Sequence, residues 1–164
     1  GMFEKFKALT NDPADIPGIG PNLVTNPGAE ADSTHWLTNV LHGMGDYAFS
    51  TPGGGSHTGE RSFAIECTGR AGQAARWYQV GIPVTEGKKY AVRAWVRASG
   101  EATGAIEIYA PNRIPLGWVD SDDEWARLVL PEFTAKGPTI GIYPTSHACG
   151  TVYFDDLFVA ELPE

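Results

Sequence analysis

Apolar and polar residues alternate along several short segments of this chain. The clearest is residues 89–98, where the apolar set Tyr90, Val92, Ala94 and Val96 alternates with Ala91, Arg93, Trp95 and Arg97. A period of two is typical of a β-strand that buries one face and leaves the other outside the core. We therefore expect a strand here with its even positions buried.

Two further segments show the same period. Tyr78, Val80 and Ile82 alternate with Trp77 and Gln79, and Ile106 and Ile108 alternate with Glu107 and Tyr109. Other strands are expected over residues 61–68, 126–130, 139–143 and 151–162. The turn-forming residues 83–88 are expected to join the strand of Trp77 to the strand of Trp95 as an antiparallel pair.

The parity of the apolar positions changes within the segment nearest the C-terminus. Val152 and Phe154 occupy even positions, whereas Leu157 and Val159 occupy odd ones. A β-bulge at residues 155–156 would bring both pairs onto one face, because a bulge inserts one extra residue into a strand. The alternative is a regular strand that buries only Tyr153, Leu157 and Val159.

Turn-forming residues punctuate the chain and leave few windows of helix length. The 164 residues include 20 Gly and 12 Pro, and this frequency of turns favours an all-β fold. The length suits one domain with a substantial core. We expect residues 21–164 to form that domain and residues 1–20, with a short amphipathic stretch at residues 3–9, to be an extension. Gly1 before Met2 is typical of a scar from tag removal.

The charge balance bears on the partners of the chain. The 12 Lys and Arg residues are outnumbered by 20 Asp and Glu residues, so the net charge is −8, and this sign repels a phosphate backbone. No segment approaches the ~18 apolar residues of a membrane span, and the first residues lack the apolar stretch of a secretory signal. We expect neither nucleic acid nor a membrane as partner.

The two cysteines do not indicate a framework of disulfide bonds. Cys67 and Cys149 are too few for a set of disulfides and do not have CxxC spacing. Neither a zinc site nor a redox motif is indicated. We expect two reduced thiols.

Motifs of the common enzyme classes are missing from the sequence. It contains no GxSxG, HExxH, P-loop or GxGxxG pattern, and its histidines are scattered among turn-rich segments. Glu107 with Asp155 or Asp156 would supply the carboxyl groups of a glycosidase, but the mechanism depends on their separation, which sequence does not encode. We expect that the chain is not an enzyme.

The strand faces outside the expected core collect aromatic and planar polar side chains. They are Trp77, Gln79, Arg93, Trp95, Arg97, Glu107, Tyr109, Arg127 and Tyr143. A sugar presents an apolar face of C–H groups and a rim of hydroxyls, so a sugar site combines flat rings with Arg, Gln or Glu. Any one of these aromatic residues is as readily explained by packing. We assign Trp36 and Trp125 to packing, and Trp118 suits either role.

Several strings along the chain resemble one known family. They are NLVTNPGAE at residues 22–30 followed by Trp36, HTGERSF at residues 57–63, EGKKY at residues 86–90 with Trp95, and YFDDL at residues 153–157. In this order they resemble carbohydrate-binding modules of families 4, 9 and 22 over about residues 22–162. The resemblance implies a jelly-roll sandwich of two antiparallel sheets. The chain departs from the family at Ala29, where a bulky aromatic residue is typical.

The resemblance also implies a structural Ca²⁺. In many members the ion is held by the Glu of the first string, an Asp of the last and backbone oxygens near the Gly of the second, which correspond here to Glu30, Asp155 or Asp156, and Gly59. Carboxylate and carbonyl oxygens are the ligands that Ca²⁺ prefers. The alternative is that Glu30 binds backbone amides at a turn and that the two Asp residues are solvated.

Two functional hypotheses follow. The first is a non-catalytic module that binds a carbohydrate on a concave sheet face centred on Trp77, Trp95 and Tyr109. The alternative is a structural or adhesion domain of a phage particle or surface assembly, in which the same sandwich contacts other domains or subunits. The resemblance favours an extracellular or virion-associated location.

Overall fold

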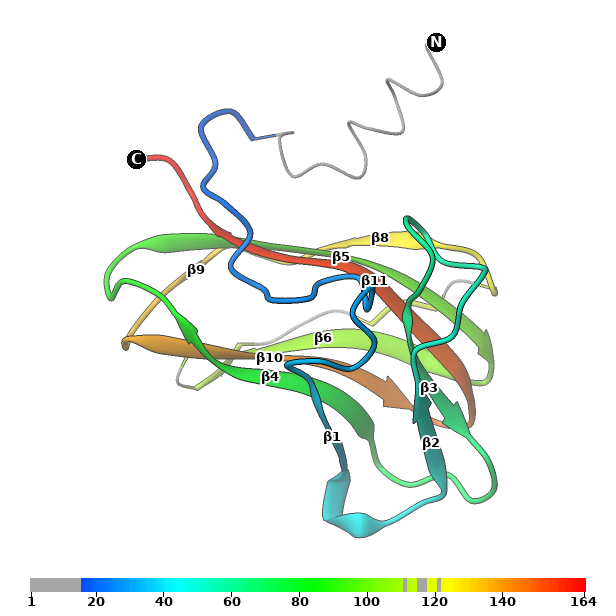
Figure 1. Cartoon of the computed structure of the whole chain (residues 1–164). Coiled ribbons are helices and arrows are strands. Elements are labelled where there is room, and N and C mark those ends of the chain that lie inside the picture. Colours follow the sequence, from blue (N-terminus) through cyan, green and yellow to red (C-terminus); the bar gives the residue numbers. More distant parts are fainter. Residues whose placement is uncertain (1–15, 111, 115–117, 121) are drawn as a thin grey trace, which may run out of the picture.

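The computed structural model of the chain describes residues 16–110, 112–114, 118–120 and 122–164. Two antiparallel β-sheets pack face to face (Figure 1). The predicted all-β jelly-roll sandwich is confirmed. The described residues contain no helix that is long and apolar enough to span a membrane.

The strands divide between the sheets as follows. The first sheet has, in spatial order, β1 (Leu37–Val40), β4 (Ala75–Pro83), β10 (Thr139–His147), β6 (Thr103–Tyr109) and β7 (Arg113–Ile114). The second sheet has β2 (Tyr47–Ser50), β3 (Phe63–Cys67), β11 (Gly150–Glu161), β5 (Lys89–Gly100) and β8 (Ala126–Val129), with β9 (Phe133–Thr134) paired to β5. A short 3-10 helix (Leu41–Gly43) follows β1.

The core lies between the two sheets and uses the alternation expected for β5 and β6. Val92, Ala94 and Val96 of β5 are fully buried, whereas the odd positions of this strand from 93 to 97 are only half-buried. Ile106 and Ile108 of β6 are also fully buried. Removal of these apolar side chains from water is the main force that holds the sheets together.

The alternation along β4 runs opposite to the prediction. Trp77 and Gln79 are buried, whereas Val80 is 53% exposed. The register against β10 shifts here, because β4 has one more residue than β10 between two paired positions, and Gly81 has a φ of +70°. This bulge reverses the parity, so Ile82 is buried on the same side as Trp77. The prediction was wrong because it extended the parity of Ile82 back across the bulge.

The bulge predicted near the C-terminus is confirmed. The register of β11 against β5 shifts between Asp155 and Phe158, and Asp156 has a φ of +51°. The apolar pairs on both sides of the shift are fully buried. The bulge thus keeps one apolar face along the strand while two carboxylates leave the regular ladder.

Residues 84–88 do not form the predicted hairpin. β4 belongs to the first sheet and β5 to the second, so this turn carries the chain from one sheet to the other. The backbone N–H of Thr85 donates a hydrogen bond to the Tyr90 hydroxyl at 2.7 Å. Turn-forming residues predicted the reversal of the chain correctly, but they do not specify which sheet receives the next strand.

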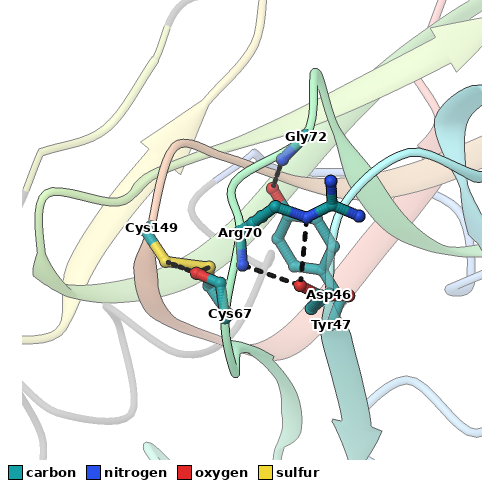
Figure 2. The surroundings of a disulfide bond; sticks show 7 residues. Asp46, Tyr47, Cys67, Arg70, Gly72 and Cys149 are labelled. Atoms are coloured by element: carbon teal, nitrogen blue, oxygen red, sulfur yellow. Dashed lines mark hydrogen bonds and ion pairs between the residues drawn. A yellow bond between two sulfur atoms is a disulfide. The ribbon is translucent and has the colours of Figure 1, made fainter.

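Cys67 and Cys149 form a disulfide (Figure 2), so the prediction of two reduced thiols was wrong. Cys67 is the last residue of β3, and Cys149 lies in the turn between β10 and β11. The two residues are 82 positions apart in the sequence, and their Cα atoms are 5.1 Å apart. No local pattern encodes such a proximity, because only the arrangement of the strands creates it.

Residues 20–24 extend the second sheet where β3 has ended, beside the C-terminal part of β11 (Figure 1). The backbone N–H of Gly20 donates to the Glu161 carbonyl at 2.9 Å, and that of Leu23 donates to the Val159 carbonyl at 2.8 Å. The expected amphipathic stretch at residues 3–9 lies outside the described residues. The described part of the domain therefore begins with a segment fastened to its last strand.

Candidate functional site

The outer face of the first sheet carries a row of polar and aromatic side chains. On β10, Ile140 and Ile142 are buried in the core, which places Tyr143 and His147 on the opposite face because side chains alternate along a strand. The register with β6 sets Tyr143 opposite Glu107. From position 141 to position 147 the row extends about 20 Å, at a rise of about 3.3 Å per residue.

Three tyrosines meet at the middle of this face. The ring of Tyr143 stacks with that of Tyr78 at a centroid distance of 5.5 Å and meets Tyr109 edge-on at 4.9 Å. The guanidinium carbon of Arg76 lies 4.7 Å from the centroid of the Tyr143 ring. Burial raises the pKa of Tyr143, so its hydroxyl stays protonated at neutral pH. The face therefore combines flat rings with hydrogen-bonding groups.

Glu107 is surrounded by cationic and hydroxyl groups. One carboxylate oxygen lies 3.5 Å from Nη1 of Arg76 and 3.5 Å from the hydroxyl of Tyr109, and the other lies 3.9 Å from Nη2 of Arg113. These contacts are long for charge-assisted hydrogen bonds. Nε of Arg76 is buried and has no hydrogen-bond partner among the described residues. The long contacts leave the Glu107 carboxylate and the Nη groups of Arg76 able to form further hydrogen bonds, whereas the buried Nε of Arg76 is out of reach of a ligand.

Trp118 and His147 lie at one end of this face. Their rings are nearly perpendicular, with centroids 4.0 Å apart, and Trp118 is 46% exposed. Burial lowers the pKa of His147, so the imidazole is neutral at pH 7. Its buried Nε2 has no hydrogen-bond partner within the described part of the chain. This end adds the partly exposed ring of Trp118 to the three tyrosine rings.

Solved structures share this architecture. A segment of the bacteriophage CBA120 tailspike protein 4 enzymatically active domain matches 86% of this chain with a TM-score of 0.65 and 14% identity, and the chain spans 21% of that protein. The CBM22-1 xylan-binding domain of Paenibacillus barcinonensis Xyn10C matches 88% of the chain and 97% of its own length (TM-score 0.64, 12% identity). TmCBM61 in complex with β-1,4-galactotriose matches 85% and 97% (TM-score 0.61, 16% identity). No protein-family model and no curated protein sequence matches the chain.

The chain has the jelly-roll fold of carbohydrate-binding modules. Within this module fold, three of the predicted ligand residues do come together. Glu107, Tyr109 and Tyr143 lie on the outer face of the first sheet and contact one another directly or through Arg76. Their alternation with buried isoleucines was the signal that placed them correctly.

Two predicted ligand residues lie in the core instead. Trp77 is 4% exposed and donates its indole N–H to the Ala64 carbonyl at 3.1 Å. Gln79 is also buried, and its amide binds the backbone N–H and carbonyl of Thr25. Placing them on a ligand face was wrong because of the bulge at Gly81.

The remaining predicted ligand residues, Arg93, Trp95 and Arg97, lie on the outer face of the second sheet, with Arg127 opposite Trp95. A single face centred on Trp77, Trp95 and Tyr109 was therefore a wrong prediction. Alternation identifies the two faces of one strand, but it does not say which strands share a sheet. β5 and β6 follow each other along the chain and belong to different sheets.

Sequence reasoning also missed residues of the first face. The parity error on β4 assigned Arg76 and Tyr78 to the core side. Recognising Gly81 as part of a bulge would have placed them on the outer face. Arg113 and His147 have no periodic signal around them, and the sequence left Trp118 open between packing and a ligand role. Contacts between distant segments bring them to the site.

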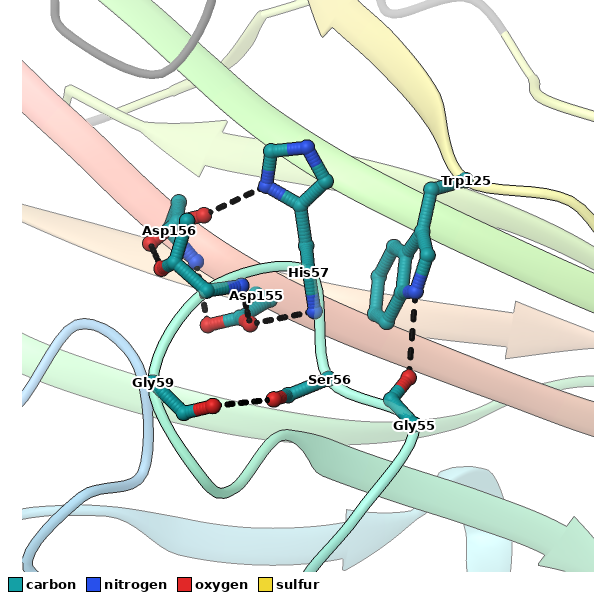
Figure 3. A network of polar contacts seen from close by, with 8 residues as sticks. Gly55, Ser56, His57, Gly59, Trp125, Asp155 and Asp156 are labelled. Atoms are coloured by element: carbon teal, nitrogen blue, oxygen red, sulfur yellow. Dashed lines mark hydrogen bonds and ion pairs between the residues drawn. The ribbon is translucent and has the colours of Figure 1, made fainter. Parts of the chain in front are cut away.

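Residues 55–57 lie beside Trp125 next to the second sheet (Figure 3). The ring of His57 stacks on Trp95 at 3.8 Å, and Trp125 donates its indole N–H to the Gly55 carbonyl at 3.1 Å. The guanidinium of Arg97 lies 4.1 Å from the centroid of the Tyr153 ring. Residues 53–61, which we call the clasp loop, thus pack over this face, and Trp125 has the packing role that we expected.

Two adjacent carboxylates fasten the clasp loop (Figure 3). Asp155 is 0% exposed and accepts hydrogen bonds from the backbone N–H groups of His57 and Thr58 at 2.9 and 3.0 Å. Asp156 accepts from the Thr58 hydroxyl at 2.5 Å and lies 2.7 Å from Nδ1 of His57. Burial, with repulsion from Asp156, raises the pKa of Asp155 to about 7.

Glu30 fastens the other end of the clasp loop. Its carboxylate accepts hydrogen bonds from the backbone N–H groups of Glu60 and Arg61 at 2.8 and 2.9 Å. A Cβ at Gly59 would stand 2.6 Å from Oε1 of Glu30, so this close approach requires a glycine. Glu30 therefore binds turn amides, as the alternative to calcium binding anticipated.

The carboxylates of Glu30, Asp155 and Asp156 are the predicted ligands of a Ca²⁺ ion. Among the described residues no group of three or more His, Cys, Asp or Glu side chains is placed to hold a metal ion, so side chains alone do not form a ligand shell. Glu30, Asp155 and Asp156 nevertheless supply hard anionic oxygens near one loop. The raised pKa of Asp155 marks buried negative charge that a cation would neutralise. The residues match a hard cation in donor type and charge, but where they lie in this structure the described side chains do not form one ligand group.

Proposed function

We propose that this chain is a non-catalytic module that binds an oligosaccharide or polysaccharide on the outer face of the first sheet. The observation that carries the proposal is the cluster of Tyr143, Tyr78 and Tyr109 beside Glu107 and Arg76. Stacked and tilted rings suit the C–H face of a sugar, and a carboxylate beside a guanidinium suits its hydroxyl groups. The length of the row suits several sugar units.

Two further observations support this proposal. The similar structures include a xylan-binding domain and a module in complex with a galactotriose, although identities of 12% and 16% do not transfer a particular sugar. The carboxyl pair considered for glycoside hydrolysis is also divided, because Glu107 lies on the first sheet and Asp155 and Asp156 lie on the second. Such a pair does not flank one scissile bond.

The proposal is tested by comparing the two outer faces. A glycan array identifies a ligand for the wild type, and isothermal titration calorimetry then measures its affinity for Tyr143→Ala and Trp95→Ala. Tyr143→Ala is expected to weaken binding at least tenfold, about 1.4 kcal/mol, because the central ring is lost. Trp95→Ala is the matched control and is expected to bind normally. Loss of binding in Trp95→Ala alone would move the site to the second sheet.

A second candidate function is a structural or adhesion domain of a phage particle or surface assembly. The observation that favours it is the match to a segment of a phage tailspike. The disulfide supports an extracellular or virion-associated location for either function, because disulfides persist in oxidising surroundings. Neighbouring genes separate the two functions, since they would encode either carbohydrate enzymes or virion components. A carbohydrate remains the expected partner, with nucleic acid and membranes not expected.

We also propose that Glu30, Asp155 and Asp156, with backbone oxygens near Gly59, hold a structural Ca²⁺. The ion would supply positive charge between β11 and the clasp loop. It would bind the folded state only, and so stabilise it. The sugar site lies on the other sheet and does not depend on it.

A further inference from the structure

We call the outer face of the first sheet around Tyr78, Tyr109 and Tyr143 the tyrosine face. Its charged groups indicate which class of glycan it would bind. The carboxylate of Glu107 lies between two guanidinium groups, at 3.5 Å from Arg76 and 3.9 Å from Arg113. The charged side chains that affect the pKa of Tyr143, at the centre of the face, are Arg76 and Glu107. Those that affect the pKa of His147 are Glu107 and Arg113. Two cations thus share one anion.

The net charge of this cluster is opposite in sign to the net charge of the whole chain. The net charge of the protein is −8, yet the central cluster of the tyrosine face has an excess of one positive charge. Glu107 is 8% exposed and Arg76 is 16% exposed, so water and salt screen these charges less than they screen fully exposed ones. An anionic ligand would therefore gain more here than on an open surface.

The unused hydrogen-bonding capacity points in the same direction. Arg113 has a side chain that is 54% exposed, and the ion pair that it forms with the described residues is a long one, at 3.9 Å from Glu107. A carboxylate matches the planar geometry of a guanidinium better than a lone hydroxyl does. Glu107 stays available to accept hydrogen bonds from neighbouring sugar hydroxyls.

We propose that the tyrosine face selects an anionic glycan and places the carboxylate of a uronic acid unit against Arg76 and Arg113. This inference rests on the proposed function, and it adds the charge of the ligand. The rings of Tyr78, Tyr109 and Tyr143 would contact the sugar ring, and the two arginines would contact its carboxylate.

The test uses polysaccharides that differ only in charge. Polygalacturonate, alginate and glucuronoxylan are each compared with their carboxyl-reduced forms, which keep the backbone linkages but lack the carboxylates, by affinity electrophoresis and calorimetry at about 0.05 M salt. At least one acidic polymer is expected to bind about tenfold more tightly than its reduced form, the magnitude of one hydrogen-bonded charge pair. The preference should shrink at about 0.5 M salt, where the Debye length is only a few ångströms.

Two charge-matched variants separate a built site from general attraction. Arg113→Gln should lose about tenfold in affinity for the preferred acidic polymer and change binding of its reduced form less than twofold. Lys89→Gln removes the same charge from an exposed position on the second sheet and should leave both affinities unchanged. Equal losses in the two variants would overturn the inference, because the preference would then come from overall charge.

The outcomes for this inference and for the proposed function differ. Equal binding of acidic and reduced polymers, abolished by Tyr143→Ala, would overturn the anionic preference and keep the proposed sugar face. Binding only to neutral glycans outside this set of polymers would likewise overturn the anionic preference and keep the proposed sugar face. Failure of every acidic and neutral glycan to bind would overturn both.

Discussion

The two outer faces of this sandwich carry similar side chains and differ in what covers them. On the first sheet Tyr143 meets Tyr78 and Tyr109, which come from neighbouring strands of the same sheet. On the second sheet the ring of Trp95 is stacked under His57 of the clasp loop. Aromatic rings and arginines therefore form the proposed binding face in one case and a packing layer in the other.

The comparison teaches that residue type alone does not identify a binding site. Trp95 and Tyr143 are both half-buried, so exposure does not separate them either. The difference lies in the partner of each ring, because Trp95 is stacked under a loop, whereas the ring partners described for Tyr143 come from strands of its own sheet. Changes at the second face should alter stability alone, and changes at the first should alter binding alone.

The largest expected effect concerns the disulfide that joins β3 to the turn between β10 and β11. The double variant Cys67→Ala/Cys149→Ala should lose about 4.5 kcal/mol of unfolding free energy, from the chain entropy of a loop closed by residues 82 positions apart. Chemical denaturation measures the loss, and glycan affinity below the melting temperature should stay within about twofold. A wild type whose melting temperature is the same with and without reductant would contradict this prediction.

Calcium should stabilise the second face without changing the first. If Ca²⁺ binds at Glu30, Asp155 and Asp156, the unfolding free energy should rise by about 2.7 kcal/mol when free ion exceeds its dissociation constant a hundredfold. Glu30→Gln should remove most of this response, and Glu66→Gln, an exposed position on β3, should keep it. Protein freed of metal, as elemental analysis verifies, should melt lower in EDTA than in calcium. Identical melts would leave Glu30 as a residue that only caps a turn.

The raised pKa of Asp155 predicts how stability depends on pH in EDTA. Its pKa is about 7 in the folded protein against 3.8 normally, so between these values the folded chain holds a proton that the unfolded chain has released. The unfolding free energy should therefore fall by at most about 1.4 kcal/mol per pH unit as pH rises through this window. Above about pH 7 it should level off. Asp155→Asn should be less stable at pH 5 and lack this slope. Equal slopes in thermal melts of both proteins would assign the effect to other groups.

The smallest expected effect concerns a glycine beneath the tyrosine face. A Cβ at Gly141 would stand 2.8 Å from Cε1 of Tyr143 and 3.1 Å from Cγ1 of Val80, so Gly141→Ala should displace the Tyr143 ring. Glycan affinity is expected to fall about fivefold, ~1 kcal/mol, with little change in melting temperature because the ring can move outward. Gly137→Ala is the control, since its Cβ would meet nothing within 4 Å. Equal affinity in both variants would show that the position of this ring does not matter.

The sequence by itself determined the faces of individual strands. The period of two along β5 and β6 identified Val92, Val96 and the two isoleucines of β6 as core, and the parity change in β11 located its bulge at residues 155–156. These features are local, because a strand turns alternate side chains to opposite sides whatever its neighbours are. Glu107, Tyr109 and Tyr143 were placed on outer faces for the same reason.

The tertiary structure alone decided which faces belong together. β4 and β10 are neighbours although more than fifty residues separate them, whereas β4 and β5 adjoin in sequence and lie in different sheets. These pairings arise from packing between distant segments, which also brought Cys67 to Cys149 and Trp118 to His147. The bulge at Gly81, read only from the register with β10, put Trp77 in the core and Arg76 at the site. A local pattern gives each strand two faces, and only long-range packing decides which of those faces form one surface.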